Sequence, residues 1–306
     1  MSDLQNPIFH DETKARKWLE SQVWPDGPFC PHCGSVEVTA LKGKAHRVGL
    51  YQCKQKECRQ QFTVTVGTLY ERSKIPLSKW LMATYLLCAS KKGMSTRQLS
   101  RMLGVSVKSS WFMMHRIRES MREKHTEPMG GAGKTVQADE TYIGRTHYRK
   151  GEVGSRGHAE KEKVFTLIED GKARSFHVPS VNAKTLKPIM RQQISRDSVI
   201  FTDEAGVYSG LRREFAQHFS VNHSIKEYVR GPVTTNACEN YFSILKRGLI
   251  GIYQHVSPQH LKRYTGEFDF RYNTRDHSDL ERTAKAVAGA WGKRLTYRRT
   301  NEAANT

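Results

Sequence analysis

The chain has 306 residues, of which 37% are hydrophobic and 9% aromatic, which is enough for a core but leaves much solvated surface. It carries 50 Lys and Arg against 30 Asp and Glu, a formal net charge of +20 that is spread along the whole sequence. Such a charge repels itself unless a polyanion binds, and the phosphate backbone of a nucleic acid is the commonest one. A basic protein with no such partner is the plainer alternative.

The sequence shows no sign of a membrane partner. No stretch approaches the roughly 20 apolar residues of a membrane-spanning helix, and the first residues, MSDLQNPIFHDETKARKW, are polar and mixed in charge, unlike a secretory signal. We therefore expect a cytoplasmic, nucleoid-associated protein. In a reducing compartment, closely spaced cysteines hold metal more often than they form disulfides.

Composition and periodicity divide the chain into segments. They are a helical segment at 1–22, a Cys-rich strand-like segment at 23–70, a helical domain at 71–127, a Gly-rich linker at 128–134, a mixed α/β domain at 135–292 and a frayed tail at 293–306. In the α/β domain, strands are expected at Thr135–Ile143, 163–169, 173–178 and 198–202, and helices after Asn182 and over 235–248. Strands in one run, followed by helices and further strands, indicate a domain built on a mixed sheet.

Two pairs of cysteines predict a zinc ribbon. Cys30 and Cys33 form a CxxC knuckle, and Cys53 and Cys58 form a second pair nineteen residues later. Two tight turns that each present two thiolates can supply the four converging ligands that tetrahedral zinc needs. Buried thiols or a redox CxxC are the alternatives, and the second pair argues against both. His32 is expected to be a bystander, and the aromatic and basic neighbours, such as Trp24, Tyr51 and Lys54, would suit a phosphate backbone.

Residues 95–118, STRQLSRMLGVSVKSSWFMMHRIR, have the layout of a helix-turn-helix. Ser95 or Thr96 can cap a first helix, Gly104 permits the turn, and Ser106 can cap a second helix able to enter a major groove. The exposed residues of that second helix are predicted to be Ser106, Lys108, Ser109, His115 and Arg116. An ordinary helical hairpin remains the alternative.

Three acidic residues of the α/β domain stand in unusual surroundings. Asp139 lies within an apolar strand, Asp203 ends another, and Glu239 lies on an amphipathic helix. A carboxylate among apolar residues is costly to bury without a compensating cation. If the three meet, they form a site for hard divalent metals, Mg²⁺ or Mn²⁺. For any one of them, a purely structural role is the commoner alternative.

Neighbours of these acids complete the predicted site. Lys246 follows Glu239 by two helical turns on the same face, where it can hold a DNA phosphate. Glu140 and Glu204 are expected to point to the opposite side from Asp139 and Asp203 if the backbone is extended.

The order of a zinc ribbon, a helix-turn-helix and the segments ADETYIG, TDEAGVY and TTNACENYFSILKRGLIGIYQHVSPQHLKRYTGEFDFRYN resembles the zinc-ribbon group of insertion-sequence transposases over residues 15–290. The resemblance implies an RNase H-like catalytic domain with Asp139, Asp203 and Glu239 as a DDE triad and Lys246 as its companion. Some members are described with an Asn as the third residue, so Asn236 is an alternative to Glu239. A carboxylate binds Mg²⁺ far better than an amide, which favours Glu239.

These features together predict a transposase that binds double-stranded DNA at the ends of its element, hydrolyses a phosphodiester and transfers the freed strand into target DNA. Two-metal chemistry with Mg²⁺ or Mn²⁺, structural Zn²⁺ and at least a dimer on DNA are expected. A DNA-binding regulator without chemistry and a nuclease without strand transfer are the alternatives. The basic, Gly-rich loop at 144–163 is read as either a solvated hairpin or an arm that clamps DNA beside Asp139.

Overall fold

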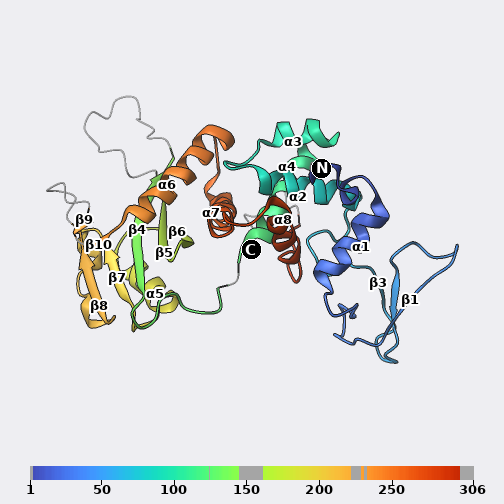
Figure 1. Ribbon diagram of the computed structural model, residues 1–306, viewed down its shortest axis with the longest axis horizontal. Coiled ribbons are helices and arrows are strands. Elements are labelled where there is room, and N and C mark those ends of the chain that lie inside the picture. The colour runs from blue at the N-terminus through green and yellow to red at the C-terminus, as the bar shows by residue number, and fades with distance from the viewer. Residues whose placement is uncertain (1–2, 124, 145–160, 222–228, 231–232, 297–306) are drawn as a thin grey trace, which may run out of the picture. The chain divides into compact units, whose positions relative to one another are not determined.

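The computed structural model describes residues 3–123, 125–144, 161–221, 229–230 and 233–296. The chain separates into two compact units, which are treated one at a time (Figure 1). Unit 1 is built from both ends of the chain, residues 1–122 and 276–306, and unit 2 from residues 123–275. Across the described ranges, each helix is too short or too polar to span a lipid bilayer.

Unit 1 contains a small antiparallel sheet in the order β1-β2-β3. Its strands are β1 (Val38–Ala40), β2 (Tyr51–Cys53) and β3 (Gln61–Phe62). Trp24 is buried and sets its ring edge-on against those of Tyr51 and Phe62. The expectation that Trp24 faces a phosphate backbone is therefore wrong, because a ribbon this small needs large rings to form its core, whereas Tyr51 is only partly buried.

The rest of unit 1 is helical. Its elements are the short helices η1 (Asp3–Gln5) and η2 (Pro7–Phe9), and the helices α1 (Glu12–Val23), α2 (Leu77–Ala89), α3 (Thr96–Leu103), α4 (Val107–Met121) and α8 (Asp279–Ala288). The Ser95 hydroxyl accepts the Gln98 N–H, 3.2 Å away, and so caps α3 as expected. Gly104, at φ +60°, ends α3 in a left-handed conformation that favours glycine, and Ser106 caps α4.

Helix α4 differs from the predicted recognition helix. His115 is 1% exposed, and Arg116 donates hydrogen bonds to the carbonyl oxygens of Leu69, Glu71 and Leu295. The expectation that these two side chains are free to contact DNA is wrong, because α2, α3 and α8 surround this part of α4. Only its N-terminal end, with Ser106 and Lys108, stays exposed.

The end of the chain belongs to unit 1. Helix α8, expected within the α/β domain, packs against α1, α2 and α4. After it, Ala290 and Trp291 pair with the segment around Thr68, and the Lys293 ammonium donates to the Glu119 and Ser120 carbonyls, 2.9 and 3.3 Å away. Residues 293–296 are therefore anchored, and the remainder of the expected tail lies outside the described residues.

Residues 128–134, which were expected to form a linker, are instead part of unit 2 and are hydrogen-bonded to its other segments. The Gly130 N–H donates to Glu169 Oε2, 2.8 Å away, and the Gly131 N–H donates to Ser198 Oγ, 2.9 Å away. Gly130 has φ +84°, and a Cβ there would lie 1.9 Å from Ser198 Oγ, so glycine is required. Local sequence cannot reveal this, because the partners lie far along the chain.

Unit 2 is built on a five-stranded mixed sheet in the order β6-β5-β4-β7-β8. Its strands are β4 (Thr135–Ile143), β5 (Glu162–Glu169), β6 (Lys172–Val178), β7 (Val199–Thr202) and β8 (Gln217–Ser220). The first three form an antiparallel meander, while β7 runs parallel to β4 and β8 parallel to β7. This order and direction are those of the RNase H-like fold, which the resemblance predicted.

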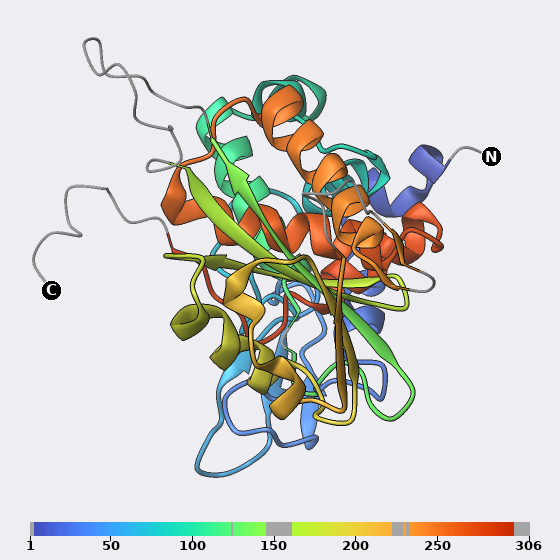
Figure 2. The same cartoon turned by 90° about the vertical axis from the view of Figure 1, so that its left-hand side faces the viewer.

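Helices cover both faces of this sheet (Figure 2). The helices are α5 (Ala183–Gln193), α6 (Asn236–Gly248), which continues into a π-helical turn (Leu249–Tyr253), and α7 (Pro258–Asn273). Val136, Ala138 and Ile200 form a core with α5 on one face, whereas Val164 and Ile168 pack with α6 and α7 on the other. Alternation along β4 therefore turns Asp139 towards the α6 side and Glu140 towards the α5 side.

Short elements complete unit 2. They are η3 (Gly206–Tyr208), η4 (Leu211–Arg213) and the two-stranded pair β9 (Val229–Arg230) and β10 (Val233–Thr234). Of the basic loop expected at 144–163, residues 145–160 lie outside the described residues.

Candidate active site

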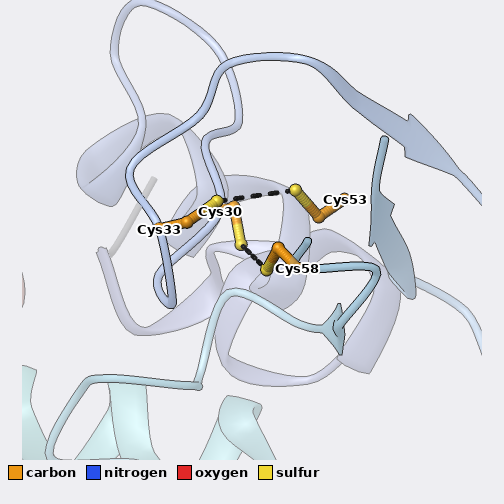
Figure 3. A group of neighbouring side chains, drawn as sticks. All are labelled: Cys30, Cys33, Cys53 and Cys58. Atoms are coloured by element: carbon orange, nitrogen blue, oxygen red, sulfur yellow. Dashed lines mark hydrogen bonds between the residues drawn. The ribbon is translucent and has the colours of Figure 1, made fainter. Parts of the chain in front are cut away.

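The four predicted cysteine ligands converge in unit 1. The sulfur atoms of Cys30, Cys33, Cys53 and Cys58 all lie within 4.8 Å of one another (Figure 3). The Sγ atoms of Cys30 and Cys58 are 3.7 Å apart, and those of Cys33 and Cys53 are 3.6 Å apart. Two thiol pairs from two turns, facing one another at this spacing, fit tetrahedral coordination by Zn²⁺.

The local backbone explains the convergence. Gly34, at φ +77°, lets its N–H reach the Cys30 carbonyl oxygen, 2.8 Å away, and so closes the first turn. Burial raises the pKa of the Cys30 thiol, but the N–H groups of His32 and Cys33 outweigh it and lower that pKa overall. This favours the thiolate form of Cys30, whereas burial raises the pKa of the Cys53 thiol to about 12. His32 itself is exposed and is not one of the four converging residues.

In unit 2, Asp139 lies on β4, and Asp203 directly follows β7, the strand parallel to β4. The last pair of the β4–β7 ladder is Gln137 with Phe201, so each acid comes two residues after this pair on its own segment. Adjacent strands are roughly 4.8 Å apart, and residues at the same level face the same side. Asp203 begins the turn after β7, where its Oδ1 accepts the Ala205 N–H, 3.0 Å away.

The third predicted acid, Glu239, approaches from α6. Gln137 Oε1 accepts the Ala237 N–H in the first turn of α6, 3.1 Å away, which ties that helix to the strand of Asp139. Glu239 is exposed, one turn after Asn236, and Lys246 is exposed two turns further on. Gln137 is a site residue that sequence reasoning missed, although its position two residues before Asp139, on the same face of the strand, was a signal.

The surroundings of Asp139 disfavour its charged form. Burial raises the pKa of the Asp139 carboxyl to about 7, and the negative charges of Glu140, Asp203 and Glu239 add to the rise. One hydrogen bond opposes it, from the Glu140 N–H to Asp139 Oδ1, 2.7 Å away. Burial and the acidic neighbours both raise the pKa of this carboxyl. A bound divalent cation would lower that pKa again, because its positive charge favours the carboxylate form.

The acids are less tightly gathered than the cysteines. In the described part of the chain, only the cysteines bring three or more candidate ligand atoms within 4.8 Å of one another. Like charges repel, so carboxylates in this arrangement need a cation between them to draw closer. The donor set of carboxylate oxygens fits Mg²⁺ or Mn²⁺.

Glu140 was expected to face away from Asp139, and it does. Glu140 turns to the α5 side, where its Oε2 accepts the hydroxyl of Tyr208, 2.5 Å away. Burial raises the pKa of Glu140, and Asp203 adds to the rise. Glu204 is exposed. Tyr208 was not singled out by the sequence, because a tyrosine five residues after Asp203 carries no distinctive pattern.

A mixed sheet with neighbouring acids at its centre, in one chain with a four-cysteine ribbon, defines an RNase H-like protein with a zinc-ribbon module. Comparison with known families agrees. Residues 130–273 match the ISXO2-like transposase domain, and residues 10–61 match the transposase zinc-ribbon domain. The chain therefore combines an ISXO2-like transposase domain with a transposase zinc-ribbon domain.

Two proteins of similar sequence have names that refer to transposition. An uncharacterised protein in transposable element ISH50 of Halobacterium salinarum is 27% identical over 280 residues, 86% of this chain and 91% of that protein. An uncharacterised transposase-like protein of Haemophilus influenzae is 29% identical over 113 residues, 37% of this chain and 83% of that protein. The crystal structure of the strand transfer complex of the Mos1 transposase aligns with a TM-score of 0.27 at 15% identity, over 74% of this chain and 82% of that one.

Proposed function

We propose that this transposase binds its element's ends as double-stranded DNA, hydrolyses a phosphodiester there and joins the freed 3′-hydroxyl to target DNA. The observation that supports the proposal is the parallel pairing of β4, which carries Asp139, with β7, which Asp203 follows, together with the hydrogen bond that ties α6, the helix of Glu239, to β4.

In this proposal, Asp139, Asp203 and Glu239 hold two Mg²⁺ or Mn²⁺ ions. Such ions activate the attacking oxygen and stabilise the leaving oxygen of a phosphodiester. Lys246 holds a phosphate of the DNA from the same face of α6, and the exposed Arg247 adds positive charge beside it. Glu239, rather than Asn236, is the third metal ligand in this proposal, because a carboxylate binds Mg²⁺ far better than an amide does.

Unit 1 recognises the element's ends. Zn²⁺ bound by Cys30, Cys33, Cys53 and Cys58 holds the ribbon, and the exposed N-terminal end of α4 is the part of the helix-turn-helix able to reach bases. Because two ends must be brought together, the active form is at least a dimer. Lysine and arginine side chains contact the backbone and set the register on the duplex.

The test is a cleavage and joining assay on labelled DNA that carries the terminal sequences of the element, with Mg²⁺ or Mn²⁺. Wild-type protein should nick the end and join it to a target, and D139N, D203N and E239Q should each abolish both steps while still binding DNA. Binding without cleavage by the wild type would leave a DNA-binding regulator. Cleavage without joining would leave a nuclease.

A further inference from the structure

A buried polar network crosses the α6 side of the sheet in unit 2. Asp269 of α7 is its centre: Oδ1 accepts the hydroxyls of Tyr241 and Ser175, at 2.6 and 2.7 Å, and Oδ2 accepts the Ser175 N–H at 2.9 Å. The Ser175 hydroxyl has only one hydrogen, so the Thr166 hydroxyl, 3.0 Å away, donates to it. The four residues, Thr166, Ser175, Tyr241 and Asp269, are called the Asp269 network.

The network touches the elements of the candidate active site at two points. Thr166 is the cross-strand partner of Asp139 in the β4–β5 register. Tyr241 lies on α6 two residues after Glu239. A continuous chain of hydrogen bonds thus runs from the residue paired with Asp139 to the helix that carries Glu239.

Asp269 places a carboxyl group in a buried position, where an apolar side chain is more usual. Asp269 is only 8% exposed, in a stretch of α7 where its chain neighbours Phe268 and Phe270 are also buried. Burial of a carboxyl is costly, and apolar residues of similar volume would often stabilise a core at least as well. What a fully bonded carboxyl adds is a defined geometry, because each oxygen fixes the direction of the groups that donate to it.

We propose that Asp269 is a positioning residue for the catalytic centre, which through Tyr241 and Ser175 sets where α6 holds Glu239 relative to Asp139. This inference rests on the proposed role of Glu239 as a metal ligand. Asp269 does not touch the reacting atoms. It acts by holding α6 to β6, as Gln137 holds the same helix to β4.

The expected consequence is a change in metal use rather than in DNA binding. Partners that orient metal ligands are worth between about 10-fold and 100-fold in metal affinity or activity. Losing one hydroxyl of the network should let α6 shift, so that more Mg²⁺ is needed for half-maximal cleavage. The DNA-contacting surface of unit 1 stays unchanged.

The experiment compares Y241F, S175A and D269N with wild-type protein on the element-end DNA. Y272F is the matched control, because the Tyr272 ring packs edge-on against Tyr241 at 5.5 Å but its hydroxyl is not part of the network. For each protein, the Mg²⁺ and Mn²⁺ dependence of cleavage, the DNA affinity and the thermal midpoint are measured. Y241F and S175A delete single hydroxyls and so still test the idea if D269N does not fold.

We expect Y241F and S175A to raise the Mg²⁺ concentration for half-maximal cleavage by about 10-fold or more, with DNA affinity unchanged, and excess Mn²⁺ to restore part of the rate. Y272F should match the wild type. Unchanged metal dependence in Y241F and S175A, or an activity loss that only follows the folded fraction, overturns the inference.

The variant E239Q distinguishes a wrong positioning role for Asp269 from a wrong assignment of the active site. If E239Q is inactive while the network variants keep wild-type metal dependence, only the positioning role is lost. If E239Q cleaves normally, the proposed site itself is wrong.

Discussion

The hydroxyl of Tyr208 donates a 2.5 Å hydrogen bond to Oε2 of Glu140, and this bond fastens the turn that begins with Asp203 to the strand that carries Asp139. Both partners are largely removed from water, Tyr208 being 1% exposed. Glu140 is thus the neighbour of a predicted catalytic acid but lies on the other face of the sheet.

We expect Y208F to lower the free energy of unfolding by about 1 kcal/mol, because it removes the hydrogen-bond donor of the half-buried Glu140 carboxyl. Urea denaturation measures this. The double variant Y208F/E140Q should recover part of the loss, since it removes the carboxylate as well. Additive losses in the double variant would show that the two side chains do not interact.

Zinc should be tied to the four cysteines. Purified wild-type protein should contain one zinc per chain by elemental analysis, and C33S or C58S should lose it and lower the thermal midpoint, because a small ribbon depends on its metal to fold. C88A removes a buried thiol outside the cluster and should keep the zinc. Equal zinc content in C33S and C88A would contradict the assignment.

The first turn of α4 and its buried remainder should respond differently to mutation. K108A should weaken DNA binding about equally for all sequences and reduce the salt slope by about 1, as loss of one phosphate contact does. H115A should instead lower the thermal midpoint, because it empties a site that is 1% exposed. Fluorescence anisotropy across a salt series and thermal melts distinguish these effects. Weaker DNA binding by H115A at an unchanged thermal midpoint would show that His115 contacts DNA.

The pH dependence of stability should carry a contribution from Asp269. Burial raises its pKa to about 7 against the hydrogen bonds from Tyr241 and Ser175, and the carboxylate of Glu123 adds to the rise. Between about pH 4 and pH 7 the folded protein then keeps a proton that the unfolded chain has lost. The stability contributed by this group is present below about pH 4 and is lost as the pH rises to 7.

We therefore expect the free energy of unfolding of wild-type protein to fall more than that of D269N between about pH 5 and pH 8. Urea denaturation at the two pH values measures the difference, and other titrating groups, Asp139 included, affect both proteins alike. Parallel pH profiles would show that Asp269 titrates at its ordinary value.

Periodicity and spacing were sufficient for much of the fold of unit 2. Thr135–Ile143 is a strand as predicted, and α5 begins directly after its Asn182 cap, because local side-chain alternation and capping decide these elements. The strand β8 was missed, since only four residues mark it and its pairing with β7 is distant in sequence.

Long-range packing explains what the sequence could not show. His115 and Trp24 read as polar or aromatic surface, yet tertiary neighbours bury both. At the candidate site, the acids themselves follow from residue type and context. Gln137 and Tyr208, which fasten the helix and the turn that carry those acids, have no local signature, because their hydrogen bonds reach across 100 and 68 positions.

The return of residues 276–296 to unit 1 has a consequence during synthesis. The ribosome releases the ribbon and the first four helices long before it makes α8 and Trp291, whose ring rests against Phe29 at 5.0 Å. Unit 1 therefore stays incompletely packed until the whole of unit 2 has been translated. Chains terminated before α8 would contain every residue of unit 2 but would lack the segment that completes the packing of unit 1.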